Sequence, residues 1–154
     1  MTNPAAVKDF VSIKVGDVVP KKVWTATKEN THAFASLTPP PADDPMRSRS
    51  PHLNEDRARE EIYGSVWTDG NHTMSLVCQT ATDWLPPDAL VSGYSEVDLR
   101  FPNPCRLGDT LTIGGEVVEK KSVDGRDVVV LKMVAESQKG KVVAAGTITA
   151  YVPR

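Results

Sequence analysis

The sequence is poor in cysteine, and it lacks both a long hydrophobic run and an excess of positive charge. Two cysteines among 154 residues cannot form a disulfide framework. No apolar run approaches the roughly 18–20 residues that span a membrane, and the N-terminus has no apolar signal-peptide segment. With 18 Lys and Arg against 20 Asp and Glu, the formal charge of −2 disfavours a general nucleic-acid binder. We therefore expect a cytoplasmic protein that binds neither nucleic acid nor membrane.

The remaining composition is that of an ordinary globular protein, with 40% hydrophobic and 25% charged residues. A chain of this length corresponds to one domain and is long enough to bury a core. We expect a single domain over residues 1–154, with an N-terminal tail at 1–10 and a proline-rich loop at 38–51. That loop holds five prolines, and long loops inside compact domains are often functional.

The first half of the chain alternates extended pieces with helices. Two short extended pieces are expected within residues 12–27. Thr27 can cap a helix over residues 28–37, and Asn54 can cap a short charged helix over residues 55–63. None of these elements is long enough to form the core by itself.

The strongest helix signal covers residues 68–84. Thr68 or Asp69 can cap its start, and Pro86 and Pro87 end it. Its apolar side chains recur at the spacing of a single buried stripe. The members of this stripe are Gly70, Met74, Val77, Cys78, Ala81, Trp84 and Leu85. The pattern predicts one long amphipathic helix near the middle of the chain.

From residue 95 onward, the hydrophobic period changes to two, which is typical of strands with one buried face. Turn signals separate these strands at Asp124-Gly125 and Lys139-Gly140, and Gly114-Gly115 suggests a bulge. The expected strands cover residues 95–101, 109–121, 126–137 and 141–152. Together they predict an antiparallel meander.

A sheet with one apolar face must cover that face, and the long helix is the obvious cover. The predicted fold class is therefore α+β, a single hot-dog fold in which a curved antiparallel sheet wraps around one long central helix. Because long strands leave an edge that normally pairs across a two-fold axis, we also expect a dimer.

Three segments carry a resemblance to a known family. They are VGD at 15–17 with FASL at 34–37, PHLNEDRA at 51–58, and LRFPNP at 99–104 with GDTL at 108–111. They resemble the MaoC-like hot-dog family of (R)-specific enoyl-thioester hydratases and dehydratases. The resemblance spans residues 15–152 and implies a carbon–oxygen lyase that acts on an acyl-CoA or acyl-carrier substrate without a cofactor.

Hydration of an enoyl thioester needs a base for the water, an acid for the α carbon and a donor for the enolate oxygen. In the family, an Asp and a His five residues apart share the acid–base work. His52 matches that His, but Arg47 stands where the family has Asp, and Asp69 stands where the central helix usually opens with His. The resemblance therefore implies His52 and Asp69 as catalytic candidates, unless Asp43 or Asp44 replaces the missing Asp.

The candidate residues also have purely structural interpretations. His52 could be a surface histidine beside a helix, and Asp69 could simply be an N-cap. Gly70 matches the family glycine whose backbone N–H points at the thioester carbonyl, or else it only packs against the sheet. His72 lies three residues after Asp69 and is either a substrate-binding residue or a buried polar residue on the helix flank.

Other polar residues give weaker signals. The spacing of Cys and His supports no metal site. Cys78 falls on the apolar stripe of the helix, and Cys105 falls in a proline-rich turn without a partner for nucleophilic catalysis. Arg47 and Arg49 either solvate their loop or contact the phosphates of CoA.

Three functions remain open from the sequence. The first is the hydratase or dehydratase. The second is a non-catalytic subunit that completes a hydratase as a heterodimer with a related hot-dog chain. It is suggested by TDWLPPDAL at 82–90, which resembles the small subunit of a two-subunit actinobacterial steroid hydratase. The third is an acyl-binding or cyclase-like hot-dog protein without hydratase activity.

Overall fold

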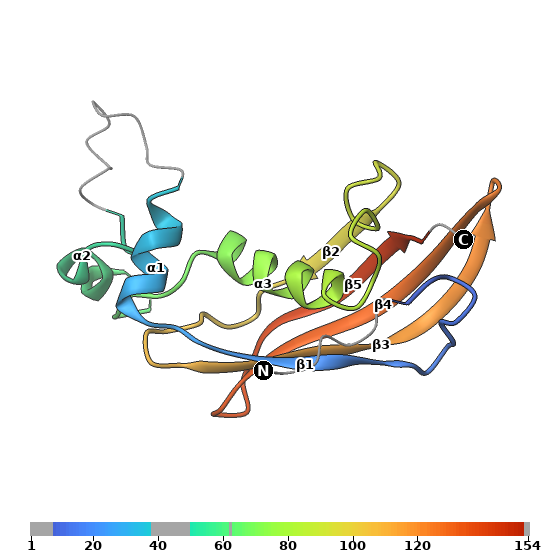
Figure 1. The fold of residues 1–154 in the computed structure, drawn as a ribbon. Coiled ribbons are helices and arrows are strands. Elements are labelled where there is room, and N and C mark those ends of the chain that lie inside the picture. The colour runs from blue at the N-terminus through green and yellow to red at the C-terminus, as the bar shows by residue number, and fades with distance from the viewer. Residues whose placement is uncertain (1–7, 38–49, 62, 153–154) are drawn as a thin grey trace.

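The computed structural model describes residues 8–37, 50–61 and 63–152 as one antiparallel sheet with its helices along one side (Figure 1). The elements are β1 (Val18–Thr25), α1 (Lys28–Ala35), α2 (Glu55–Glu60), α3 (Gly70–Thr82), β2 (Glu96–Arg100), β3 (Thr110–Val123), β4 (Arg126–Ser137) and β5 (Val142–Tyr151). The strand order is β1-β3-β4-β5-β2, and every neighbouring pair is antiparallel. This confirms the predicted α+β hot-dog fold. No helix among these residues is long and apolar enough to cross a membrane.

The two sharp turns of the meander follow from their glycines. Asp124 and Gly125 have φ angles of 51° and 76°, which suit the tight hairpin between β3 and β4. Gly140 has a φ of 70° in the turn between β4 and β5. Both predicted turns are confirmed.

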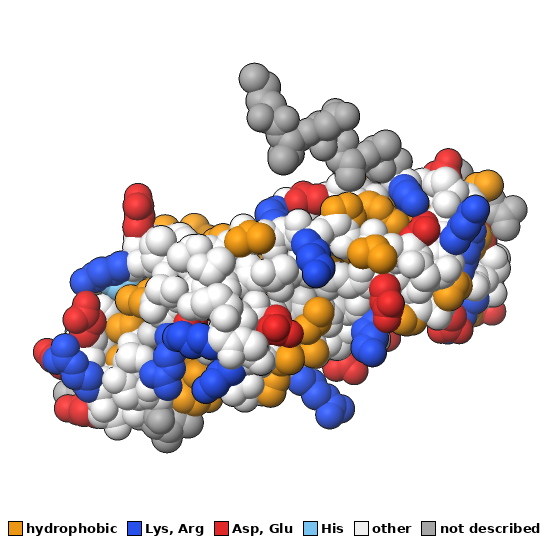
Figure 2. All heavy atoms as spheres, turned by 90° about the horizontal axis from the view of Figure 1, so that it is seen from below, with side chains coloured by type: hydrophobic (Ala, Val, Ile, Leu, Met, Phe, Trp, Pro, Cys, Tyr) orange, Lys and Arg blue, Asp and Glu red, His pale blue; other side chains and the backbone are white. Residues whose placement is uncertain are grey.

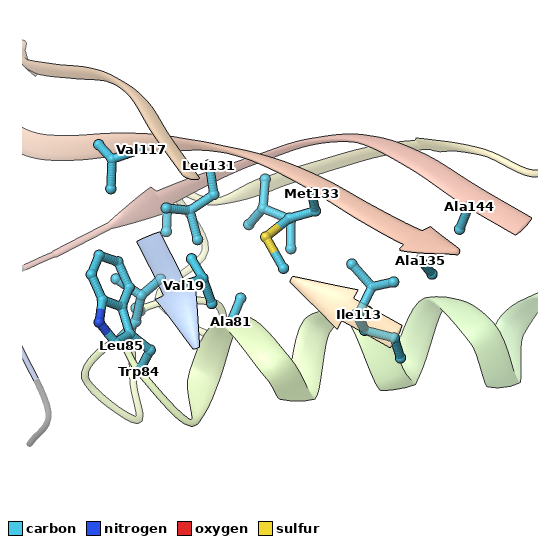
Figure 3. Close-up of a cluster of buried hydrophobic side chains, with 14 of the residues drawn as sticks. Val19, Ala81, Trp84, Leu85, Ile113, Val117, Leu131, Met133, Ala135 and Ala144 are labelled. Carbon is cyan, nitrogen blue, oxygen red and sulfur yellow. The ribbon is translucent and has the colours of Figure 1, made fainter. Parts of the chain in front are cut away.

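The core lies between the inner face of the sheet and α3. Figure 3 shows Ile113, Leu131 and Met133 of the sheet on the side that faces Ala81 of the helix. These side chains are at most 1% exposed. Full burial of one such side chain stabilises the folded state by roughly 1.5–3 kcal/mol, so the contact between helix and sheet is the main source of stability.

The buried face of α3 differs from the predicted stripe. Val77 and Ala81 are buried as expected, but Met74 and Cys78 are only half-buried. Thr73 and Thr80 are buried in their place. The Thr80 hydroxyl donates to the backbone oxygen of Leu76 at 2.8 Å, which satisfies it inside the core. The buried face of α3 is therefore rotated relative to the stripe predicted from hydrophobic residues alone, because it includes two threonines.

The N-terminal region also departs from the expectation. Residues 1–7 lie outside the described residues, but residues 8–10 are not a free tail, because Phe10 is buried and the backbone N–H of Lys8 donates to the oxygen of Trp84. Only one of the two extended pieces expected within residues 12–27 is a strand, β1. The Lys120 ammonium lies 4.3 Å from the Phe10 ring centroid and helps to hold this region.

The bulge expected at Gly114-Gly115 lies on the opposite strand. The β1–β3 register shifts between Val19 and Lys22, which pair with Gly115 and Ile113. The extra residue of β1 therefore lies opposite Gly114. The absence of a side chain at Gly114 gives the bulged strand β1 room to approach, whereas Gly115 leaves room for β4 on its other side.

The face of the sheet away from α3 is mixed in character. Figure 2 shows apolar side chains among charged ones along its whole length. A groove of about 850 Å³ crosses this face, and its lining includes Val18, Val134 and Gly146. None of the candidate catalytic residues lines this groove.

The two neighbouring glycines of β3 allow a matched stability test. A Cβ at Gly115 would lie 2.5 Å from both the Lys132 oxygen and the Met133 sulfur, whereas one at Gly114 would meet only the flexible Lys21 side chain closely, at 3.1 Å. We expect Gly115→Ala to lower the free energy of unfolding by about 1–3 kcal/mol, and Gly114→Ala by clearly less. Urea denaturation measures both. Equal losses would contradict the packing described for this strand.

Candidate functional site

The start of α3 is fixed by a neighbouring segment of the chain. The backbone N–H of Thr68 donates to the oxygen of Cys105 at 2.8 Å, and Trp67 forms an isolated antiparallel bridge with Arg106. The N–H of Leu107 donates to the oxygen of Val66 at 3.4 Å. Residues 66–68 are therefore held against residues 105–107, and the first turn of α3 has a defined position.

Asp69 caps α3, as its structural interpretation predicts. One oxygen of its carboxylate accepts from the N–H of Asn71 at 2.8 Å, and its backbone oxygen accepts from His72 and Thr73. No described residue donates to the second carboxylate oxygen. The half-buried Asp69 thus keeps one oxygen available, and its catalytic role stays a prediction.

Gly70 presents a free backbone N–H at the start of α3. No described group accepts a hydrogen bond from it, and unpaired N–H groups of this kind carry the positive end of the helix dipole. A Cβ built at Gly70 would meet no atom within 4 Å. Close packing against the sheet therefore does not explain this glycine, and the space beside it is open.

Gly70 also lines a small pocket of about 100 Å³, which we call the helix pocket. Gly70 and Thr73 of α3 line it together with the aromatic side chains of Tyr63, Trp67 and Phe101. The mixture of apolar and polar lining groups resembles that of a small-molecule site, but a volume of this size admits only a small part of a ligand. Sequence patterns did not indicate Tyr63 or Trp67, because both lie in an irregular segment without periodicity.

His52 is attached to the wall of the helix pocket. Its Nδ1 lies 2.8 Å from the backbone oxygen of Trp67, and its ring packs edge-to-face on the Trp67 ring at 5.2 Å. A carbonyl oxygen can only accept, so Nδ1 is the donor. In the neutral ring, Nε2 then carries the lone pair that a general base needs.

His72 is enclosed by aromatic side chains. Its ring stacks on Phe34 at 4.2 Å and meets Trp24 edge-to-face at 4.9 Å. The side chain is 8% exposed, and its Nδ1 is buried without a hydrogen-bond partner among the described residues. Burial lowers the pKa of His72, and the nearby Asp69 charge opposes this in part. His72 does not line the helix pocket, so its substrate-binding role stays a prediction.

Both cysteines are free thiols held in apolar surroundings. Burial raises the pKa of Cys105 to about 11 and also raises the pKa of Cys78. The thiolate form required of a nucleophile is therefore scarce at neutral pH. Cys105 serves as part of the helix pocket wall.

The loop residues considered from the sequence are Asp43, Asp44, Arg47 and Arg49. All four lie outside the described residues. Of the candidate residues, Gly70 lines the helix pocket, and His52 contacts the Trp67 wall without lining the pocket itself. The catalytic role of His52 and the substrate-binding role of Gly70 stay predictions.

These features define a hot-dog protein with a small pocket at the start of its central helix. Residues 50–139 match the sequence profile of the family described as "MaoC like domain". The chain therefore belongs to the MaoC-like domain family. Among curated proteins, no sequence matches the chain.

Solved structures agree with this assignment. The chain is similar to the monoamine oxidase regulatory protein from Archaeoglobus fulgidus, with a TM-score of 0.74, 26% identity and coverage of 95% of this chain and 94% of that chain. It is also similar to the MaoC-like dehydratase from Rhodospirillum rubrum, with a TM-score of 0.73, 25% identity and coverage of 96% and 97%. The R-hydratase PhaJ1 from Pseudomonas aeruginosa shares the fold at 22% identity, with a TM-score of 0.73 and coverage of 95% and 86%.

The buried His72 predicts a defined pH dependence of stability. Its pKa in the folded chain lies below its ordinary value of 6.5, so the unfolded chain binds more protons as the pH falls through that value. The free energy of unfolding should therefore decrease below about pH 6.5, where the unfolded histidine begins to titrate. We expect His72→Phe to remove this part of the decrease. Urea denaturation at several pH values measures the free energy of unfolding of the unmodified chain and of His72→Phe. The same decrease with falling pH in both proteins would contradict the burial argument.

Proposed function

We propose that the chain is an (R)-specific enoyl-thioester hydratase or 3-hydroxyacyl-thioester dehydratase. The observation that carries this proposal is the hydrogen bond between His52 Nδ1 and the Trp67 oxygen. This bond orients the imidazole ring and sets its tautomer. Trp67, which accepts the bond, lies three residues before Gly70. Membership of the MaoC-like family and the fold shared with the R-hydratase support the same reaction class.

The proposed reaction adds water across the α,β double bond. His52 Nε2 takes a proton from water, and the resulting hydroxide forms the new C–O bond at the β carbon. The displaced electron pair moves to the thioester oxygen, where the Gly70 N–H and the helix dipole stabilise the enolate. The α carbon then takes up a proton from the His52 imidazolium, directly or through the Asp69 carboxylate, as the carbonyl reforms, and His52 returns to its neutral form. Dehydration is the same sequence in reverse.

Asp69 is the second acid–base candidate in this proposal. Its capping oxygen fixes the carboxylate at the start of α3, next to Gly70. The other oxygen can exchange a proton with substrate or water. In this role Asp69 would replace the carboxylate that the family places five residues before its histidine.

The primary test is turnover by the purified chain with crotonyl-CoA and with a bulkier enoyl-CoA, followed as loss of the enoyl-thioester absorbance. We expect His52→Ala to lower the rate by about 10²–10⁴-fold, the usual contribution of general acid–base catalysis. Circular dichroism checks that the variant keeps its fold. An unchanged rate in a folded His52→Ala protein would remove His52 from the mechanism.

A pair of substitutions separates the capping role of Asp69 from its chemistry. Asn caps helices as well as Asp does, so Asp69→Asn should preserve stability while losing the ionisable group. Asp69→Ala should lose about 1 kcal/mol of stability in addition. We expect both variants to lose activity to a similar extent. Full activity in Asp69→Asn would show that Asp69 is only a cap.

A non-catalytic subunit is the second candidate function. The observation that favours it is Arg47 at the position of the family Asp, because arginine cannot act as a base at neutral pH. The fold is shared with a chain of the ChsH1–ChsH2 complex from Mycobacterium tuberculosis, at 23% identity. This candidate requires the chain to be inactive alone and active after co-expression with a related hot-dog chain. An active homodimer would exclude it.

A further inference from the structure

A second pocket lies beside the helix pocket, and we call it the basic pocket. It has a volume of about 280 Å³ and shares Tyr63, Asn103 and Pro104 with the helix pocket. Its other walls come from the start of β3 and from the turn between β4 and β5 (Figure 1). The two pockets therefore adjoin at these residues.

The basic pocket is lined by more positive than negative side chains. Arg106, Lys139 and Lys141 face a single acidic side chain, Asp109. The chain as a whole carries a formal charge of −2, so this excess of positive charge is local. Local excess of one sign in a concave site concentrates ligands of the opposite sign.

The negative charge of Asp109 is already used by its neighbours. The Lys139 ammonium lies 2.7 Å from one carboxylate oxygen, and the backbone N–H of Arg106 donates to the other at 3.0 Å. Although burial acts to raise the pKa of Asp109, these hydrogen bonds hold it below its usual value. Asp109 therefore neutralises Lys139 and leaves the other two cations uncompensated.

Arg106 and Lys141 have no anionic partner among the described residues. The Arg106 guanidinium donates to the backbone oxygen of Tyr63 and to the Ser65 hydroxyl, which are neutral acceptors. These bonds fix the orientation of the guanidinium without cancelling its charge. The Lys141 ammonium forms no ion pair with a described residue.

The scaffold beneath these cations is rigid. Ser137 and Lys141 close the β4–β5 turn with a backbone hydrogen bond of 2.9 Å, and the Ser137 hydroxyl accepts from the N–H of Lys141. The Asn103 side chain donates to the oxygen of Val142 at 2.8 Å and ties the shared wall to this turn. The backbone that carries the cations and the Arg106 guanidinium are thus held in place before a ligand binds, which limits the entropy lost on binding, while the exposed Lys141 side chain is free to adjust.

We propose that the basic pocket binds a phosphate group on the pantetheine arm of the thioester substrate. This inference rests on the proposed function, because it assigns a binding site to the phosphate of the same thioester substrate. Lysine and arginine side chains bind phosphate through charge-assisted hydrogen bonds, and the thioester substrate carries a phosphate on its pantetheine arm. The pocket is smaller than the ~300–1,000 Å³ that a whole drug-sized ligand occupies, so it accommodates one part of a longer molecule. CoA and a carrier protein both present a phosphate on this arm.

The test measures binding of CoA to the full chain by titration calorimetry, without turnover. We expect Lys141→Ala to weaken binding about tenfold, because a charge-assisted contact is lost. Lys141→Arg should retain most of the affinity, since the charge is kept. Lys121→Ala is the matched control, an exposed lysine of β3 that pairs with Glu119 outside the pocket, and it should leave the affinity unchanged.

Ligand truncation identifies the group that is recognised. The effect of Lys141→Ala should persist with 4′-phosphopantetheine and disappear with pantetheine, which lacks the phosphate. A holo acyl carrier protein, titrated in parallel, decides between the two sources: the ligand that shows tighter binding and the full Lys141 effect is the physiological handle.

Three results would overturn the inference. They are no measurable binding of any of the phosphate-bearing ligands, an equal loss with Lys121→Ala, or the same Lys141→Ala effect with pantetheine. Because binding is read without catalysis, its failure is distinct from failure of the hydratase proposal. An inactive chain that binds CoA through Lys141 would contradict the hydratase and leave the basic pocket assigned.

Discussion

The contact between α3 and the inner face of the sheet determines where everything else in this molecule can lie. The strands are long and apolar on one side, and among the described helices α3 is the one that lies along that side. Leu111, Ile113 and Leu131 are fully buried by this arrangement. A helix that must lie there cannot start at an arbitrary point, because the segment that leads into it is joined to the β2–β3 connection through the hydrogen bond from Thr68 to Cys105. The core therefore defines the position of the helix N-terminus, where the candidate chemistry takes place.

One short segment then positions two unrelated groups. Residues 66–68 lead into α3 and so place the Gly70 N–H, and the backbone oxygen of Trp67 in the same segment orients His52. In the proposed mechanism, the base and the oxyanion donor are therefore both positioned by one piece of backbone. This is the preorganisation that general acid–base and electrostatic catalysis both require. It depends on main-chain atoms, and therefore tolerates considerable change in side chains nearby.

The dependence of the site on main-chain contacts also explains which parts of the molecule the sequence could predict. The strands β3 to β5, their glycine turns and α3 were predictable because periodicity and positive-φ residues are local signals. The burial of Phe10 was not predictable, because a single aromatic residue before the first strand forms no periodic pattern. His52 and Gly70 were found through the family resemblance, but the bond from His52 to Trp67 was not, since a backbone oxygen carries no information about residue type. The aromatic lining from Tyr63 and Trp67 was missed for the related reason that it lies in an irregular segment.

In the proposed binding mode, the basic pocket recognises the phosphate of the substrate and the helix pocket recognises its acyl group. This division affects the choice between an enzyme and a non-catalytic subunit. The cations of the basic pocket touch a part of the ligand that does not react, so they bind ground state and transition state alike. Such contacts hold the thioester near the Gly70 N–H without distinguishing one acyl group from another. Selectivity must then come from the apolar lining of the helix pocket, where Trp67 and Phe101 lie. A chain that kept the handle site but lost an acid–base residue would still deliver substrate to a partner. The presence of Lys141 and Arg106 is therefore compatible with both functions, and the acid–base chemistry proposed for His52 separates them.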